Sequence, residues 1–152
     1  MVPALRLASD NSSSDWGVGG SSQGAKPGNG HARKHTILVV EDEVIIRLSI
    51  ADYLRECGYR VLEAADAKEA QTVLQAGEPI EIVFSDINMP GEMNGFGLAS
   101  WVRDNYPDVR IILTSGVSHK AVNVESEYGP LLQKPYPYEA VLAQIKKTLL
   151  GG

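Results

Sequence analysis

Polar side chains that can take part in phosphoryl chemistry stand directly after four short apolar runs in this chain. Glu41 and Asp42 follow TILVV, Asp86 follows EIVFS, Ser115 follows VRIILT and Lys134 follows PLLQ. Converging carboxylates repel one another unless a hard cation lies between them, and ligand sets made of oxygen atoms favour Mg²⁺. With the metal in place, a third carboxylate can attack a phosphoryl group while an ammonium and a hydroxyl bind the phosphoryl oxygens. The pattern therefore predicts phosphoryl transfer to Asp86.

This chemistry requires that the apolar runs are strands of one sheet. From Thr36 onwards, short apolar runs alternate with longer segments of helical period, which is typical of βα units around a parallel sheet. Ligands of an open α/β sheet bind at the carboxyl ends of its strands, so four strands would deliver their polar groups to one edge. The predicted strands are Thr36–Val40, Tyr59–Glu63, Glu81–Ser85, Val109–Thr114 and Pro130–Gln133.

The segments between the strands predict helices that cover the sheet. In the first, apolar residues recur at three- and four-residue spacing and end with Cys57, which we expect in the core before Gly58 ends the helix. Asn94 is the expected N-cap of the third helix, and Pro137 is expected in the first turn of the last. The fourth is the least regular, because it is short and carries two β-branched valines. The predicted helices are Glu43–Cys57, Ala67–Gln75, Gly95–Tyr106, Ser118–Glu127 and Pro137–Leu150.

Composition indicates one domain over residues 34–150, preceded by an arm. Residues 1–33 are dominated by Gly, Ser, Asn and Asp, and they predict a disordered arm or leader because little apolar surface is available to offset ordering entropy. A net charge of −5 disfavours nucleic-acid binding. No apolar run approaches the roughly 18 residues of a membrane span. The lack of a secretory signal and the single cysteine fit a cytoplasmic protein, which we expect as a monomer or weak homodimer.

Four motifs together carry a resemblance to a known family. VVEDE, FSDINMPGEMNG, LTSG and QKPY, in this order and spacing, resemble the receiver domain of bacterial two-component response regulators. The resemblance extends over residues 34–150 and is specific because the four motifs are linked. It implies an α/β fold with a doubly wound, flavodoxin-like parallel sheet of five strands in the order 2-1-3-4-5, flanked by five helices.

The resemblance also implies a role for each acidic residue. Asp86 would be the phosphoacceptor. Mg²⁺ would be bound by Glu41, Asp42, Asp86 and the backbone carbonyl of Asn88. Such a domain catalyses only its own phosphorylation and dephosphorylation, so the chain is not expected to be an enzyme with a separate substrate.

The remaining motifs imply how a bound phosphoryl group is held and reported. Lys134 would contact the phosphoryl group, Ser115 would be the switch hydroxyl, and the Lys134–Pro135 peptide bond would be cis. The phosphoryl donor would be a histidine kinase or a histidine phosphotransfer protein. We expect a domain that stands alone without an output domain, so the expected output is onward phosphotransfer or docking to a downstream protein that the sequence does not identify.

Three features depart from the usual pattern of the family. The loop Met89–Gly95 after the acceptor carries an extra residue, and the spacing from Ser115 to Lys134 is shorter than usual. The fifth strand has Leu131 where the family usually has an aromatic switch residue. Coupling through an aromatic rotamer is therefore not expected, and the output is expected to use another element.

Two apolar side chains on the last helix allow two interpretations. Tyr138 and Leu142 lie one turn apart beside the predicted core stripe of that helix. They either form an apolar docking patch or widen the core stripe.

Other functions remain open from the residues alone. Asp86 by itself could cap a turn, and the Glu41-Asp42 pair could complement a helix dipole, although their joint placement favours the site. One alternative is a phosphate-independent interaction module, a pseudo-receiver. Another is a hydrolase with an aspartyl-phosphate intermediate, but such enzymes commonly need a second acid/base, and Asn88 stands where that group would be.

Overall fold

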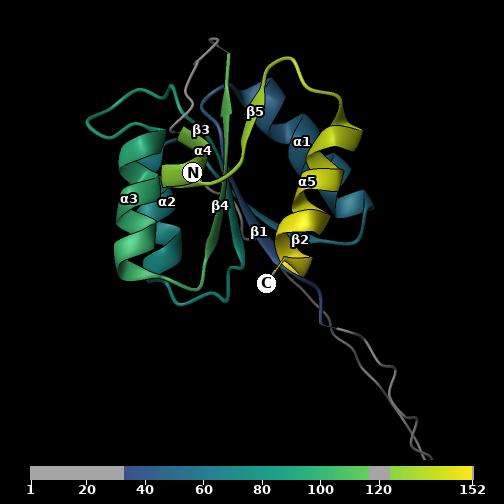
Figure 1. Cartoon of the computed structure of the whole chain (residues 1–152), viewed down its shortest axis with the longest axis horizontal. Helices are drawn as coiled ribbons and strands as arrows, with labels where there is room; N and C mark the ends of the chain where they lie inside the picture. The colour runs from purple at the N-terminus through teal and green to yellow at the C-terminus, as the bar shows by residue number, and fades with distance from the viewer. Residues whose placement is uncertain (1–32, 117–123, 152) are drawn as a thin grey trace, which may run out of the picture. The chain divides into compact units, whose positions relative to one another are not determined.

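The computed structural model of this chain describes residues 33–116 and 124–151, which form a parallel sheet covered by helices on both faces. The strand order is β2-β1-β3-β4-β5, and every strand pair is parallel (Figure 1). This confirms the predicted fold. The strands are β1 Thr36–Val40, β2 Arg60–Ala64, β3 Ile82–Asp86, β4 Arg110–Ser115 and β5 Leu131–Gln133.

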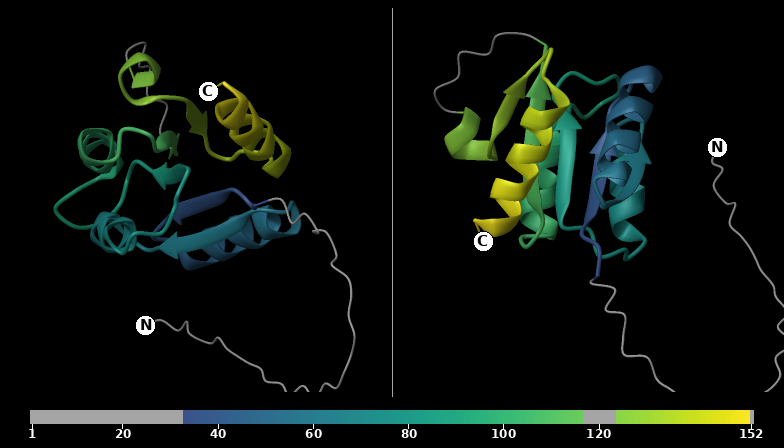
Figure 2. Two further views of the ribbon diagram at one scale, coloured as in Figure 1. Left: turned by 90° about the horizontal axis from the view of Figure 1, so that it is seen from below. Right: turned by 90° about the vertical axis from the view of Figure 1, so that its right-hand side faces the viewer.

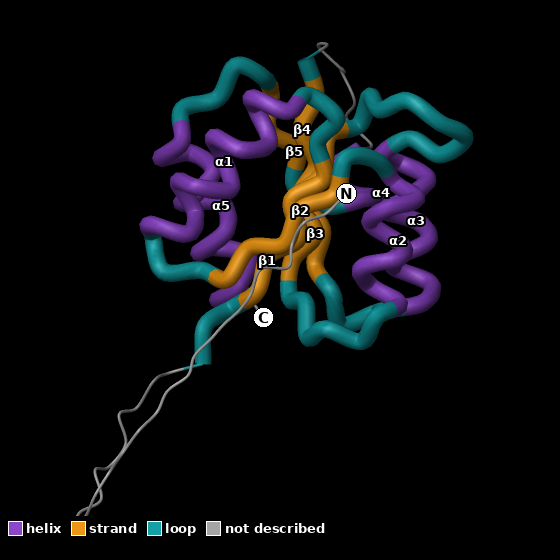
Figure 3. Tube along the Cα trace, turned by 180° about the vertical axis from the view of Figure 1, so that it is seen from behind, coloured by secondary structure: helices purple, strands orange, loops and turns teal. Residues whose placement is uncertain are grey.

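The helices form one layer on each side of the sheet. Helices α1 and α5 cover one face, and α2, α3 and α4 cover the other (Figures 2 and 3). The alternation of strand and helix winds the chain outward in both directions from β1 and β3. The helices are α1 Val44–Glu56, α2 Ala67–Gln75, α3 Gly95–Asn105, α4 Val124–Tyr128 and α5 Tyr138–Leu150.

The strand β1 shows why the central apolar runs are continuous. Its five residues are all buried, because successive side chains point to opposite faces and both faces are covered. Ile37 and Val39 pack in the cluster formed with α1 and α5. Leu38 and Val40 pack in the cluster formed with α2 and α3. The sheet is therefore packed on both faces, and this packing positions the carboxyl ends of its central strands.

Local sequence signals account for most helix ends. The Asp66 side chain caps α2 by accepting from the Glu69 N–H at 2.8 Å. Asn94 caps α3 as predicted, by accepting from the Gly97 N–H at 3.0 Å. Pro137 is the N-cap of α5, one position before the first turn in which it was expected.

The prediction for Cys57 was wrong, because its thiol is exposed rather than in the core. Leu54 is the last buried residue of α1, and Cys57 occupies the C-cap after the last helical residue. Gly58 then reverses the chain with a φ of 101°. Cys57 still has helical backbone angles, so the helical period is kept, but the buried part of the helix ends at Leu54 and the side chain of Cys57 lies beyond it.

The other elements agree with the predicted ones within a residue or two at most ends. Strands β2, β3 and β4 each begin and end one residue later than predicted, so Asp86 and Ser115 are the last residues of their strands. The predicted fourth helix is confirmed only from Val124, because residues 118–123 lie outside the described part of the chain. Over the described residues, no helix is both long enough and apolar enough to span a membrane.

Candidate functional site

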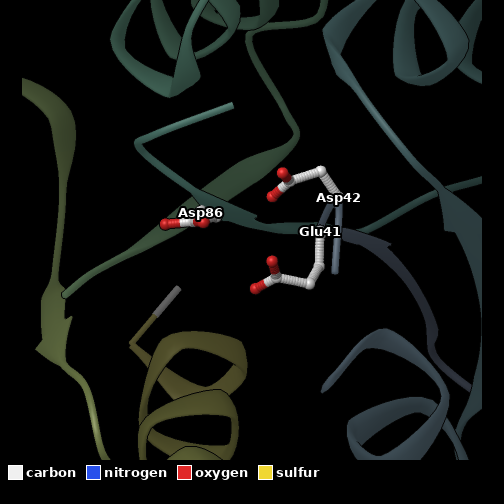
Figure 4. Close-up of side chains that lie close together, drawn as sticks. All are labelled: Glu41, Asp42 and Asp86. Atoms are coloured by element: carbon white, nitrogen blue, oxygen red, sulfur yellow. The ribbon is translucent and has the colours of Figure 1, made fainter. Parts of the chain in front are cut away.

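Three carboxylates meet at the carboxyl edge of the sheet (Figure 4). Glu41 and Asp42 follow β1, and Asp86 ends the neighbouring strand β3, where Val40 is paired with Ser85. One carboxylate oxygen from each residue lies within 4.8 Å of the other two. The convergence expected from the sequence is therefore present.

Lys134, which directly follows the edge strand β5, completes this cluster. Its Nζ donates to Glu41 Oε1 at 3.0 Å and to Asp86 Oδ2 at 3.2 Å. The Lys134 N–H donates to the Ser115 carbonyl at 2.8 Å, which extends the pairing of β5 with β4 up to the lysine. The Lys134–Pro135 peptide bond is cis, as the family resemblance implied.

The carboxylates of Glu41 and Asp86 are buried, with side-chain exposures of 5% and 7%. Burial raises the pKa of both groups, because it disfavours the charged form, while Lys134 acts in the opposite direction. Burial alone would lower the pKa of Lys134, but the hydrogen bond to Glu41 and the charge of Asp86 outweigh it, so that pKa is raised. One ammonium thus faces three carboxylates, and the site retains an excess of negative charge when all are ionised.

This set of ligands fits a hard divalent cation. All three candidate ligands offer carboxylate oxygens, and two of them are buried with their charge only partly compensated. Mg²⁺ is typically bound by one or two carboxylates and keeps several of its waters. The chemistry of the donors therefore suits Mg²⁺ better than a transition metal, which would favour imidazole or thiolate ligands.

The other two predicted site residues lie at the same edge. Ser115 ends β4 next to the Asp86–Thr114 pair and is buried, with 1% of its surface exposed. Asn88 lies two residues after Asp86, and its N–H is 3.4 Å from Asp86 Oδ1, a long contact for a hydrogen bond. The roles of the Ser115 hydroxyl and of the Asn88 carbonyl stay predictions.

Two supporting residues were missed by the sequence analysis. The Arg47 Nη1 donates to the Glu41 carbonyl at 2.8 Å, while its Nε pairs with Glu63 Oε1 at 3.3 Å. Gly95 packs so closely that a Cβ there would lie 2.4 Å from the Asp86 carbonyl oxygen. Arg47 resembles an ordinary surface residue of a helix, and no local pattern marks the close approach of Gly95 to the backbone of Asp86.

Comparisons with known proteins agree with this geometry. The family model of the response regulator receiver domain matches residues 37–146. The chain is 32% identical over 121 residues to a probable chemotaxis protein CheY of Rhizobium etli, an alignment that covers 76% of this chain and 92% of that protein. It is 34% identical over 119 residues to the sensor kinase CckA of Brucella abortus, which covers 75% of this chain but only 12% of the kinase.

A solved structure shares the fold and a substantial part of the sequence. The response regulator protein TrrA of Thermotoga maritima, in complex with Mg(2+)-BeF, is 30% identical to this chain with a TM-score of 0.68. The comparison covers 75% of this chain and 98% of that one. The order of the motifs, the strand order and these relatives agree, and the chain belongs to the response regulator receiver domain family of two-component systems.

Proposed function

We propose that Asp86 accepts a phosphoryl group from the phosphohistidine of a histidine kinase or a histidine phosphotransfer protein. Mg²⁺ would be held by Glu41, Asp42, Asp86 and the carbonyl of Asn88. The observation that carries this proposal is that three carboxylates meet within 4.8 Å and that the Lys134 ammonium forms hydrogen bonds with two of them. The proposed domain spans residues 34–150 and acts in the cytoplasm as a monomer or weak homodimer.

The reaction transfers one phosphoryl group between two side chains. A carboxylate oxygen of Asp86 forms a bond to phosphorus as the bond from phosphorus to the histidine nitrogen breaks, and the electron pair leaves with the nitrogen. When bound, Mg²⁺ neutralises charge that develops on the transferring oxygens. Lys134 reaches Asp86 Oδ2 at 3.2 Å and is therefore placed to hold another phosphoryl oxygen.

The Ser115 hydroxyl is the proposed reporter of phosphorylation. Ser115 ends β4, and its carbonyl is already tied to the Lys134 N–H. A hydrogen bond from its hydroxyl to a phosphoryl oxygen would change the start of the segment that follows β4. The output is then onward phosphotransfer or docking of a downstream protein on the changed surface.

The donor protein must bring its phosphohistidine to the edge that carries Asp86, so its docking surface must lie beside that edge. The first turns of α1 expose apolar side chains there, with exposures of 52% for Val44, 74% for Ile45 and 43% for Leu48. Ile45 and Tyr138 also line a hollow that extends to Lys134. We infer that the donor docks on this apolar surface, with Tyr138 as part of it.

A test of the acceptor is the mass of the protein after incubation with acetyl phosphate and Mg²⁺. We expect an increase of one phosphoryl group in the wild type and in the control Asp52→Asn, which changes an exposed aspartate of α1. Asp86→Asn should remain unmodified. An unmodified wild type, or equal labelling of Asp86→Asn, would contradict the proposal.

A Mg²⁺ titration separates this proposal from a phosphate-independent pseudo-receiver. We expect Mg²⁺ to stabilise the wild type by about 2.7 kcal/mol at a hundred times its Kd, because it binds the folded state. Glu41→Gln should weaken that effect. A wild type whose stability is unchanged by Mg²⁺ and which takes up no phosphoryl group would favour the pseudo-receiver.

A further inference from the structure

A second hollow lies at the opposite end of the sheet from Asp86. Its volume is about 440 Å³, and its walls come from α3, β4, the end of α4, the turn between α4 and β5, and α5. We call it the basal hollow, defined by Arg103, Arg110, Ile111, Tyr128 and Lys147. Arg110 begins β4 and Ser115 ends it, so at about 3.3 Å per residue the hollow lies ~16 Å from the acceptor edge. It is therefore a separate site.

The walls of the basal hollow are apolar and firmly placed. Ile111 and Tyr128 contribute apolar surface, and the Tyr128 ring packs on Phe96 with ring centroids 4.9 Å apart. The turn after Tyr128 lies directly on β4, because a Cβ on Gly129 would be 2.7 Å from the Ile111 carbonyl oxygen. Gly129 has a φ of 112°, which favours glycine. The wall is thus preformed and suits a flat apolar group.

Three cations line the same hollow. The Arg110 Nη1 donates to the Thr148 carbonyl at 2.8 Å, and the Arg103 Nη1 donates to the Glu127 carbonyl at 3.0 Å. Lys147 lines the hollow from the last turn of α5. These carbonyl bonds fix each guanidinium but use only one of its five N–H donors.

The pairing of these cations differs from that of other arginines in the chain. Arg47, Arg55 and Arg60 each pair with a carboxylate, at 3.3, 3.0 and 2.7 Å respectively. Among the residues that the structure describes, no carboxylate forms an ion pair with a cation of the basal hollow. Glu127 is the one acidic residue among the described residues that line the hollow, so three cations face one carboxylate in a chain of net charge −5. This is a local excess of positive charge.

Helix dipoles explain part of this arrangement but not all of it. Arg103 and Lys147 lie in the last turns of α3 and α5, where a cation complements the helix dipole. The helix dipoles do not explain the presence of Arg110, which lies on a strand. They also do not explain the apolar hollow between the cations. A ligand with both an apolar body and a negative group accounts for both features.

We propose that the basal hollow binds a small amphipathic anion, with a flat apolar body against Ile111 and Tyr128 and a phosphate or carboxylate group on Arg110 and Lys147. A volume of about 440 Å³ is within the range of small-molecule sites. Guanidinium groups bind both phosphate and carboxylate through charge-assisted hydrogen bonds. The site is independent of phosphoryl transfer at Asp86.

The test is an NMR titration of the full, ¹⁵N-labelled chain in buffer without phosphate. The probes are 2-naphthylphosphonate, which cannot donate a phosphoryl group to Asp86, and 2-naphthoate, which carries the same ring. We expect saturable shifts of the Ile111 and Gly129 amides with at least one of them, and because the ring is shared, the preferred probe identifies the anionic group. Methylphosphonate and the neutral 2-naphthylmethanol should bind at least about tenfold more weakly, because each lacks one half of the recognised chemistry.

Variants assign the binding to the cations. Arg110→Gln and Lys147→Gln should each weaken binding about tenfold, while Arg60→Gln, at the other edge of the sheet, should not. If Arg110→Gln fails to fold because it loses the hydrogen bond to Thr148, the binding measured with Lys147→Gln, a change at an exposed residue, tests the role of the cations. Asp86→Asn should bind the probes normally, so failure of the acceptor test leaves this result unaffected.

Several results would overturn the proposal. They are the absence of saturable shifts at Ile111 and Gly129 up to millimolar probe, equal binding of the neutral alcohol, and unchanged binding in Lys147→Gln. The proposal would also be overturned if a peptide of Glu and Leu caused saturable shifts of the Ile111 and Gly129 amides while neither small anion did. The hollow would then be a protein-docking site.

Discussion

The Nζ of Lys134 bridges Glu41 and Asp86, at 3.0 Å from Oε1 of the first and 3.2 Å from Oδ2 of the second. Both carboxylates are buried, and burial raises the pKa of each. The lysine therefore offsets part of the charge repulsion that remains at this edge without a metal ion. A bound Mg²⁺ would offset the same repulsion, so the two cations are partly interchangeable for stability.

From this relationship we expect Lys134→Met to lose stability mainly in the absence of metal. Methionine keeps most of the apolar stem but leaves two buried carboxylates without an ammonium, which should cost about 2–3 kcal/mol in a chelator. The loss should shrink in saturating Mg²⁺. Urea denaturation in both conditions measures it, with Lys68→Met on the exposed surface of α2 as the control. Equal losses with and without Mg²⁺ would show that the lysine does not act through these carboxylates.

A second prediction concerns Gly95, at the start of α3. A Cβ there would lie 2.4 Å from the Asp86 carbonyl oxygen and 2.6 Å from the Ile87 Cα, so backbone must move. Gly95→Ala should lower the free energy of unfolding by roughly 1–3 kcal/mol and slow the labelling of Asp86 by acetyl phosphate.

Gly97→Ala is the matched control for Gly95→Ala. Its added Cβ would meet Met93 Cγ at 2.8 Å, which is the flexible part of a side chain and can shift. Alanine also favours the helix over glycine by about 1 kcal/mol. We therefore expect Gly97→Ala to be near neutral in urea denaturation and in labelling. A similar loss in both variants would contradict the proposed contact with Asp86.

A third prediction concerns the alkaline stability of the domain. Tyr136 packs edge-on against Phe84, and burial raises its pKa from 10.0 to about 12, although the charge of Lys134 acts in the opposite direction. The folded state therefore keeps this proton in a pH range where the unfolded state releases it. By linkage, the stability that Tyr136 contributes is full below pH 10 and is lost as the pH rises to about 12.

Tyr136→Phe tests this dependence because it removes the ionisable group and keeps the ring. The difference in free energy of unfolding between wild type and Tyr136→Phe should decrease as the pH rises from 10 to about 12. Urea denaturation over that range, together with the tyrosinate absorbance, gives the result. Parallel stability curves for the two proteins would refute it.

A fourth prediction tests the docking surface of the phosphoryl donor. Ile45 is 74% exposed beside the acceptor edge, so Ile45→Ser should slow phosphotransfer from the cognate histidine kinase by about tenfold or more. Labelling by acetyl phosphate should not change, because this small donor needs no docking surface. The kinase is identified first by a phosphotransfer profile against the histidine kinases of the source organism.

Leu150→Ser is the control for Ile45→Ser. Leu150 is also apolar and is 85% exposed, but it ends α5 and lies outside the surface beside the acceptor. Phosphotransfer to Leu150→Ser should match the wild type. If Ile45→Ser also matches the wild type, the donor docks elsewhere.

Much of the candidate site was predictable because strands and their ends are local features. Largely apolar runs of four to six residues marked the strands, and parallel strands bring their carboxyl ends to one edge, so Asp86 and Lys134 could be placed together. Gly95 and Arg47 could not be assigned in this way. Their importance depends on contacts with the backbone of Asp86 and Glu41, which no local pattern specifies. The prediction that Cys57 lies in the core failed for a related reason, because the helical period does not show where the buried part of the helix ends.

The sequence by itself determined the order of the elements and which residue types stand at the strand ends. Apolar periodicity, caps and turn residues act over a few positions and are visible in the chain. Only the tertiary structure decided that the Lys134 Nζ lies 3.0 Å from Glu41 Oε1, in a residue 93 positions away, and that the basal hollow forms at the other end of the sheet. Such contacts form only when the whole sheet assembles, because packing between distant segments fixes them.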